Sequence, residues 1–455
     1  MNKKETKISK EIKINKKLAR RNYSNQTGIT LIALVVTIVV LLILAGVSIN
    51  ALFSENGIIK RAQDAQNKMN NAQESDLNAL NDLDKWINNQ VNGTTGGNTT
   101  GGNDNPSTTP KISTLVGKVV DKNTKAEDAY GNKITIPKGF KILEHNPTSS
   151  TGAVTYNYTN SEETGEHIPA VQDGIVIEDT QTGTAGNQFV WVPVGTIKNK
   201  NGSTNTITLG RYEFDSSTGA LKSTTPAQVA SVENCTKIVT ISKGGTDYQE
   251  LSTFREGNSA TNSTAQNATA RNLEEFISTT LANGGYYIAR FEASGTASKI
   301  ASKYNQTVLG NITQPNAAKV AREMYGEVKE NNELVYASDL VNSYAWDTAI
   351  VFIQTYSGKT DYASHNESIT TKAFTATGKN NDKYCNIWDM SGNAYEWTTE
   401  YSAYSDGSDF YPCVLRGGYY STGYGLAINY ASYRYDVITT YGGSGDSLRS
   451  LLYVK

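Results

Sequence analysis

The sequence is poor in cysteine, histidine and charged side chains, and these shortages exclude several kinds of protein. Its 455 residues contain only three cysteines, too few for a fold built on disulfides. The three histidines show no His-x-x-x-His spacing, and neither a Gly-x-Ser-x-Gly elbow nor a His-Glu-x-x-His motif occurs. We therefore expect neither a histidine-held iron site nor the common hydrolase sites.

Charged residues make up only 19% of the chain, and they are unevenly distributed. Residues 1–28 hold nine Lys and Arg against two Glu, a charge of +7, so the total of −2 leaves −9 for the remainder. An acidic remainder argues against nucleic acid as a partner. Gly, Ser, Thr, Asn and Tyr are plentiful instead, which is typical of extracellular binding surfaces.

One long hydrophobic run stands directly after the basic segment. Residues 29–49 contain only Thr30, Thr37 and Ser48 as mildly polar members, and the run is long enough to cross a bilayer. Because basic flanks stay in the cytoplasm, the rest of the chain is expected outside. The pattern predicts a single-pass protein of the cell membrane with an extracellular C-terminal domain.

The start of this run resembles a type IV prepilin processing site, in which a basic leader is cleaved after glycine. The matching residues are Gly28 and Ile29, but the fifth mature position is Ala33 where most such pilins have Glu. Two alternatives follow. A cleaved, pilus-associated subunit would have prepilin peptidase and pilin-like subunits as partners, whereas an uncleaved segment would be a simple membrane anchor.

The chain divides by composition into four segments. A helix-compatible stalk continues the membrane segment, and a run rich in Gly, Thr and Asn then forms a flexible tether because it has too few large apolar residues to build a core. The expected segments are a basic leader at 1–28, a transmembrane or pilin-like helix and stalk at 29–90, a linker at 91–111, and a C-terminal domain at 112–455.

The C-terminal domain is expected to be α+β, with short strands, two helices and much irregular loop. Period-two or continuous apolar patterns predict strands at 133–137, 174–178, 188–194 and 285–292. Helical spacing predicts helices at 268–282 and 339–356, and 198–264 is expected to be an insertion of long loops.

A signature near the C-terminus points to a family. Residues 387–397 read IWDMSGNAYEW, in which Trp388 and Trp397 can anchor a core, and Arg416 stands before two glycines further on. This pattern resembles the formylglycine-generating-enzyme-like (sulfatase-modifying factor) domain, a variant of the C-type lectin-like fold. The resemblance implies that fold for the C-terminal domain and an internal, bracing role for Arg416 and Arg434.

The family's best-known activity requires two cysteines that follow the Arg-Gly-Gly element. This chain has no cysteine after Cys413, so it lacks the thiolates that would bind copper or carry the redox chemistry. We therefore expect no enzyme activity and no copper or iron. Cys385 and Cys413 flank the signature, and either they form a disulfide or they are two buried thiols.

The resemblance also implies a structural calcium ion at the signature turn. Its ligands would be the side chains of Asp389 and Glu396 and the backbone carbonyls of Gly392 and Ala394, all oxygen donors that suit this cation. Alternatively, the two carboxylates hydrogen-bond to the backbone of the turn.

The tail of the chain lacks five residue types that all occur earlier. Residues 401–454 contain no Lys, Glu, Gln, Trp or Met, while 401–455 hold eleven of the 27 tyrosines. The composition resembles the variable region of diversity-generating retroelement proteins, which display diversified C-type lectin-like domains. Tyr gives wide, stiff contact area, and Ser, Gly and Asn adapt around it, as in antibody loops.

The tail is therefore predicted to bind a ligand, either a protein or a glycan. The expected contact residues are Tyr419, Tyr420, Tyr424, Asn429, Tyr430, Tyr433, Tyr435, Asp436 and Tyr441, of which some are expected in the core. The main hypothesis is a surface-anchored, non-catalytic binding or adhesion protein. The alternatives are a minor pilin or pseudopilin with a structural head and an enzyme of the formylglycine-generating type.

Overall fold

The computed structural model describes most of the unit Asn105–Lys455. The described residues are 109–157, 167–233, 235, 239–243, 245–250, 267–366, 373–420 and 430–455. The predicted membrane segment and stalk, residues 91–108 of the predicted linker, the processing site at Gly28 and Ile29, and the predicted contacts Tyr424 and Asn429 lie outside them. Within these residues, no helix combines the length and apolarity that crossing a membrane requires.

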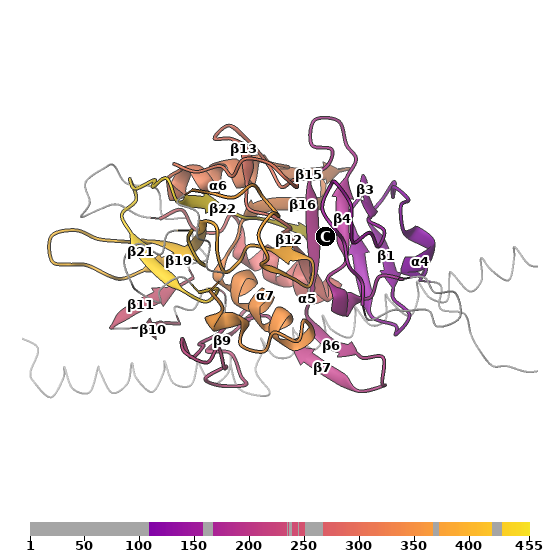
Figure 1. Ribbon diagram of the computed structural model, residues 1–455, viewed down its shortest axis with the longest axis horizontal. Coiled ribbons are helices and arrows are strands. Elements are labelled where there is room, and N and C mark those ends of the chain that lie inside the picture. The colour runs from indigo at the N-terminus through magenta and orange to yellow at the C-terminus, as the bar shows by residue number, and fades with distance from the viewer. Residues whose placement is uncertain are drawn as a thin grey trace, which may run out of the picture. The chain divides into compact units, whose positions relative to one another are not determined.

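A seven-stranded antiparallel sheet forms the centre of the domain (Figure 1). In spatial order its strands are β15 (Glu327–Glu330), β16 (Glu333–Leu340), β23 (Ser450–Val454), β12 (Gly285–Ala289), β5 (Gln188–Pro193), β4 (Val176–Asp179) and β3 (Phe140–Ile142). Every residue of β5, β12 and β23 is buried. The sheet therefore has structure packed on both of its faces, which explains the continuous apolar runs in its central strands.

A second sheet of six strands lies toward the left of Figure 1 and contains most of the strands of the tail. Its strands are β10 (Ile241–Lys243), β11 (Thr246–Gln249), β19 (Tyr395–Ser402), β20 (Cys413–Arg416), β21 (Arg434–Val437) and β22 (Asp446–Leu448). β22 pairs with β19 in parallel, whereas the other pairs are antiparallel. The signature strand β19 thus lies between tail strands on both sides.

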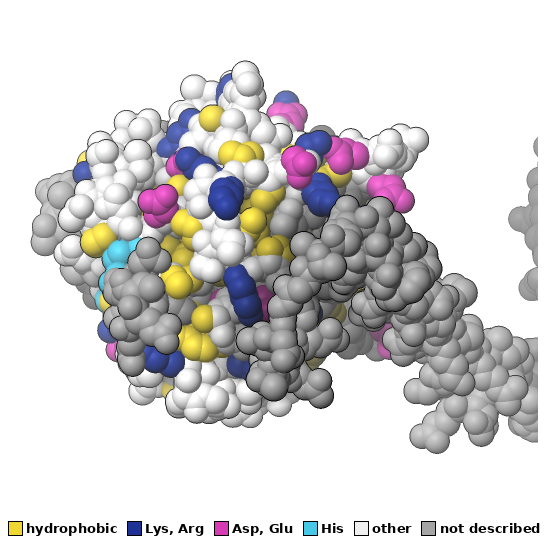
Figure 2. Space-filling view, turned by 90° about the vertical axis from the view of Figure 1, so that its right-hand side faces the viewer, with side chains coloured by type: hydrophobic (Ala, Val, Ile, Leu, Met, Phe, Trp, Pro, Cys, Tyr) yellow, Lys and Arg dark blue, Asp and Glu magenta, His cyan; other side chains and the backbone are white. Residues whose placement is uncertain are grey.

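Five two-stranded sheets complete the described strands. They pair β1 (Thr124–Glu127) with β2 (Lys133–Ile136), β6 (Gly195–Lys198) with β7 (Thr204–Ile207), β8 (Gly210–Arg211) with β9 (Gln228–Val229), β13 (Ser294–Thr296) with β14 (Lys299–Ala301), and β17 (Lys383–Tyr384) with β18 (Ile387–Trp388). Figure 2 shows the side of the domain where β1, β3 and α4 lie, with hydrophobic side chains between scattered Lys and Arg.

Three helices of ten or more residues occur in the described part: α5 (Leu273–Asn283), α6 (Gln314–Glu323) and α7 (Ser343–Tyr356). Shorter ones are α4 (Ile112–Leu115) and the 3₁₀ turns Val171–Asp173 and Tyr362–Ser364. α5 and α7 start at asparagine caps, because the side chains of Asn272 and Asn342 accept hydrogen bonds from Glu275 N and Ala345 N.

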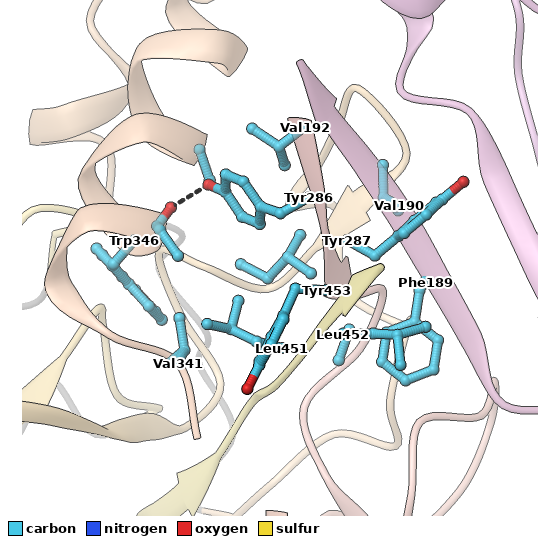
Figure 3. Close-up of a cluster of buried hydrophobic side chains, with 14 of the residues drawn as sticks. Phe189, Val190, Val192, Tyr286, Tyr287, Val341, Trp346, Leu451, Leu452 and Tyr453 are labelled. Atoms are coloured by element: carbon cyan, nitrogen blue, oxygen red, sulfur yellow. Dashed lines mark hydrogen bonds between the residues drawn. The ribbon is translucent and has the colours of Figure 1, made fainter. Parts of the chain in front are cut away.

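The core joins the helices to the seven-stranded sheet (Figure 3). Trp346 of α7 is fully buried, and the hydroxyl of Tyr286 on β12 donates a hydrogen bond of 2.5 Å to Ala345 O. Trp397 is also fully buried and donates to Ile312 O at 2.7 Å, as expected of an anchor residue. These contacts hold α7 and β19 in fixed positions relative to the sheet.

The predicted elements agree with the structure in their interiors and differ at their ends. The four predicted strands match β2, β4, β5 and β12. The helix predicted at 339–356 starts later, at Ser343, because Asp339 and Leu340 are the last residues of β16. The helix predicted at 268–282 starts at its cap, Asn272, and α6 was not predicted. The region 198–264, predicted as loops, contains β7 to β11.

The described domain is rich in strands and has few helices, which is consistent with the expected C-type lectin-like architecture.

Candidate ligand-binding face

A buried network of ion pairs fixes the strands that carry the tail. Glu400 of β19 accepts from Arg211 at 2.8 Å, from Arg416 at 3.1 Å and from Arg434 at 3.0 Å. Asp347 of α7 accepts from Arg416 at 2.5 Å and from Arg434 at 2.9 Å. All five side chains are almost completely shielded from solvent. The expectation that Arg416 and Arg434 brace the fold is confirmed.

The electrostatics of this network are dominated by Glu400. Burial alone would raise the pKa of its carboxyl group, but Arg434, Arg416 and Arg211 lower that pKa to about 2. Glu400 is therefore charged at neutral pH, and it joins the strands of Arg211, Arg416 and Arg434 to β19.

The alternation of side chains along β21 separates the scaffold from the exposed face. Arg434 and Arg416 are opposite each other in the β20–β21 ladder, and both point into the ion-pair network. The next residue, Tyr435, must then point to the opposite side of the sheet. Tyr435 is 42% exposed, whereas Arg434 is buried.

The tyrosines on this opposite side form a connected stack of rings. Tyr395 of β19 lies parallel to Tyr419, with ring centroids 5.3 Å apart and 12° between the ring planes. Its ring is also 5.8 Å from Tyr435 and 6.3 Å from Tyr433, and the last two rings are stacked at 6.3 Å. We call Tyr395, Tyr419, Tyr433, Tyr435 and Tyr441 the tyrosine face.

The predicted contact residues differ in how accessible they are. Tyr435 and Tyr441 are exposed, at 42% and 43%, and Tyr419, Tyr433 and Asp436 are partly exposed. Tyr420 and Tyr430 are only 9% and 7% exposed, so these two predicted contacts belong mainly to the core. Tyr420 packs edge-on against Phe374, and Tyr430 against Tyr433.

Sequence reasoning missed two residues of this region, Tyr395 and Asp446. Tyr395 is the hub of the ring stack and directly precedes Glu396 in the signature, where the sequence analysis gave it no role of its own. Asp446 pairs with Tyr395 in the parallel β19–β22 ladder. That pairing joins residues far apart in the chain, so no local pattern could have revealed it.

Two glycines of the tail allow close contacts, one with the signature turn and one with a ring of the tail itself. A Cβ atom on Gly418 would lie 2.2 Å from Ser391 O, and one on Gly445 would lie 2.0 Å from the ring of Tyr419. Only glycine fits at both positions, since real Cβ atoms do not approach other atoms so closely. Tyr420 N also donates to Asn393 O at 3.1 Å. The signature turn thus fixes the start of the segment that follows Gly418.

A hollow of about 200 Å³ opens beside Tyr430. Its lining includes Phe214, Asp215, Ser432 and Arg434. The ring of Tyr430 contacts that of Tyr433, with centroids 5.3 Å apart. Arg434 points to the side of β21 opposite Tyr435, so the hollow that it lines does not open on the tyrosine face.

The residues predicted to bind calcium do not fit that ion in this arrangement. Both carboxylate oxygens of Glu396 accept hydrogen bonds from Arg449, at 2.5 and 2.8 Å. Asp389 accepts from Asn380 Nδ2 at 2.9 Å and from Gly378 N at 3.3 Å, and burial together with Asp382 raises its pKa to about 7. Gly392 and Ala394 have no side-chain oxygen, so they could contribute only backbone carbonyl oxygens to a calcium ion. Among the described residues, no group of His, Cys, Asp or Glu side chains is arranged to hold a metal.

Comparisons with known proteins give no family assignment. No family model and no curated protein matches this chain. The solved structures that it resembles include Treponema denticola variable protein 1, with 12% identity, a TM-score of 0.25, and coverage of 48% of this chain and 98% of the other. They also include the U1 and M1 variants of the Major Tropism Determinant.

The U1 variant has 11% identity and a TM-score of 0.21, and the M1 variant has 12% identity and a TM-score of 0.19; both alignments cover 76% of this chain and 98% of the other. These proteins are of the variable kind that the tail composition resembles. The identities and TM-scores are too low to support an argument about this chain's function. The resemblances to formylglycine-generating enzymes and to prepilins stay predictions.

The three cysteines are thiols, so the predicted disulfide between Cys385 and Cys413 is not present in this structure. Cys385 lies in the turn between β17 and β18, where its Sγ is 3.9 Å from Gln172 O. Cys413 begins β20, with Sγ 3.9 Å from Thr439 Oγ1. The signature does not bring the two flanking residues together, because each packs against a different part of the domain.

We expect thiol titration to find all three cysteines as thiols. Burial raises the pKa of Cys413 to about 12, so its thiol should react slowly until the protein unfolds. Titration with a thiol reagent in denaturant, without reductant, should count three thiols per chain. A count of one would instead show that two cysteines are bonded.

Proposed function

We propose that the C-terminal domain is a non-catalytic binding module that recognises a protein or glycan through its tyrosine face. The observation that carries the proposal is the stack around Tyr395, in which Tyr435 is exposed, with Tyr441 exposed near Asp446. The strands beneath are fixed by Glu400 and Asp347. Rigid aromatic side chains on a fixed scaffold bind without a large loss of conformational entropy.

The chemistry available on this face supports binding rather than catalysis. Tyrosine hydroxyls, ring surfaces and aspartate carboxylates can donate, accept and stack, but none of the three thiols lies among them. The arginines beneath the face are all engaged in internal ion pairs. The expected absence of family chemistry rests on the sequence, because no cysteine follows Cys413.

In the proposed protein, residues 29–49 anchor the chain in the cell membrane and the linker holds the domain outside the cell. The resemblance at Gly28 and Ile29 supports a second possibility, a minor pilin or pseudopilin that carries the domain as its head. Mass spectrometry of the chain from cells that express a prepilin peptidase separates the two, because only the second predicts loss of residues 1–28.

The tail composition also supports diversification of the face. If the tail is diversified, the DNA near the gene should hold a near-copy of the segment that encodes residues 401–454, differing mainly at adenines. Sequencing the flanking DNA tests this directly. A tail that is identical in many isolates, with no near-copy nearby, would contradict diversification.

Alanine substitutions should separate binding from stability. Because Tyr435 and Tyr441 are exposed, we expect Tyr435→Ala and Tyr441→Ala each to weaken binding by roughly tenfold or more, with little change in unfolding free energy. Tyr420→Ala should instead destabilise the domain, because that ring is buried against Phe374.

The measurement uses a ligand selected on the full-length chain from a peptide library or a glycan array, together with urea unfolding of each variant. Tyr130→Ala, in the turn between β1 and β2, serves as the matched control and should leave binding unchanged. Equal affinities for the wild type, Tyr435→Ala and Tyr441→Ala would show that the ligand binds elsewhere.

A further inference from the structure

The arginines of the tail point into the interior, whereas the buried carboxylate of Asp446 lies with the tyrosines. Residues 401–455 contain three arginines, one lysine at the C-terminus and four aspartates. Arg416 and Arg434 pair with Glu400 and Asp347, and Arg449 pairs with Glu396, so all three arginines point inward. Asp446 instead lies beside the tyrosine face, opposite Tyr395 in the β19–β22 ladder, and gives this side a negative group.

Asp446 is a buried carboxylate with no cationic side chain beside it among the described residues. It is only 3% exposed, and its Oδ2 accepts a hydrogen bond of 2.7 Å from Gly443 N. No lysine, arginine or histidine of the described residues is within ion-pair distance of it. A buried carboxylate without a cationic partner is costly, and a cation brought by a ligand would relieve that cost.

The tyrosines surround this carboxylate. Tyr395 is opposite Asp446 in the β19–β22 ladder, and the hydroxyl of Tyr441 and the Oδ2 of Asp446 both lie close to Gly443, at 2.7 and 2.9 Å from the position of a Cβ atom there. Burial raises the pKa of Asp446 to about 6, which leaves it mostly charged at neutral pH. The carboxylate therefore lies in an aromatic surrounding that opens at Tyr441.

Asp436 lies on the other side of β21, because it directly follows Tyr435 in that strand, and it accepts a hydrogen bond of 3.0 Å from the hydroxyl of Tyr248. Asp215 lines the hollow beside Tyr430 together with Arg434. Asp446 is therefore the carboxylate of these three that lies with the tyrosines. Glu213 and Lys222, also in the lining of that hollow, are 3.8 Å apart and offset each other.

We propose that the partner of the tyrosine face is a protein segment that presents arginine or lysine side chains, with one cationic group seated between Tyr435 and Tyr441 above Asp446. The face supplies both components that such a group requires, π surfaces for cation–π contact and a carboxylate for charge pairing. This inference rests on the proposed function, and it narrows the partner from a protein or glycan to a basic protein surface.

The test begins with selection from a displayed random peptide library on the full-length chain, with counter-selection on the Tyr435→Ala/Tyr441→Ala double variant. We expect the enriched peptides to be rich in Arg and Lys. Their affinity should fall by about tenfold on Asp446→Asn and should fall further as salt is raised. Glu330→Gln on the edge strand β15 removes one exposed charge from the other sheet and should change nothing.

Unfolding in urea should show that Asp446→Asn folds, since asparagine has nearly the same size and keeps an acceptor for Gly443 N. Asp436→Asn makes the same change on the other side of β21, so it serves as a matched control and should leave binding unchanged. Peptides or glycans that bind through the tyrosines but carry no cation would overturn the inference and leave the proposed function intact. If no ligand depends on Tyr435 and Tyr441, both fail.

Discussion

The Glu400→Gln variant is expected to lose about 3–5 kcal/mol of unfolding free energy. Glutamine has the same shape as glutamate, so the substitution removes the charge and little else. Arg416 and Arg434 would then share the carboxylate of Asp347. Arg211, also fully buried, would lose its ion pair with Glu400. The loss is large because a buried guanidinium without its counter-charge has no water to replace it.

Glu330→Gln is the matched control for this measurement. It breaks an ion pair with Lys138 in which both side chains are about half exposed, and such pairs contribute less than about 1 kcal/mol. Chemical unfolding of both variants at neutral pH gives the comparison. If Glu400→Gln and Glu330→Gln both lost only a small amount of unfolding free energy, the ion-pair network would not brace the second sheet.

The second large effect is a fall in stability as the pH rises from about 5 to about 8. Glu250 is fully buried, and burial raises its pKa to about 7 although Ser343 and Thr399 donate hydrogen bonds to it. The folded state therefore keeps a proton that the unfolded chain, with an ordinary pKa near 4.5, has already released. The protonated Glu250 therefore contributes its full stabilisation of the folded state below about pH 4.5, and this contribution is lost as the pH rises through about 7.

The raised pKa of Glu250 corresponds to a loss of about 3 kcal/mol of unfolding free energy between pH 5 and pH 8. The pKa of Asp389 is also raised to about 7, so this residue lowers the stability over the same pH range. Below about pH 4.5 the sign reverses, because protonation of Glu400 removes the stability that its lowered pKa represents. Stability should therefore be highest between about pH 4.5 and 5.5.

Unfolding in urea across this pH range measures the effect. Glu250→Gln should have a visibly flatter profile above pH 5, since the glutamine side chain does not titrate. A wild-type profile that is flat or rises between pH 5 and pH 8 would contradict the account of these buried carboxyl groups.

The sequence allowed the interior of the domain to be predicted better than its connections. The apolar runs in β5 and β12 are long enough to identify buried strands without any knowledge of their neighbours. The end of β16 could not be separated from α7, because no glycine or proline stands between Asp339 and the helix to mark a boundary. Only pairing with β23, more than a hundred residues later, assigns them to a strand.

The candidate face was predicted from composition, and the details depended on packing. The alphabet of the tail predicted Tyr435, Tyr441, Tyr420 and Tyr430 alike as ligand contacts. It could not distinguish the first two, which are exposed, from the last two, which have the same side chain and are buried. The partner of Glu396 is Arg449, which a local motif cannot reveal. For that reason the signature suggested a calcium ligand at a residue that forms an ion pair.

The central claim is that the tail presents accessible tyrosines on a rigid scaffold, and hydroxyl-radical footprinting of the full-length chain with mass spectrometry tests it most directly. The comparison is made among tyrosines only, so the residues compared have the same intrinsic reactivity toward the hydroxyl radical. Tyr435 and Tyr441 should be oxidised several-fold faster than Tyr420 and Tyr430. Equal, slow oxidation of all four would mean that the tyrosines are buried together, and the proposed binding face would not exist.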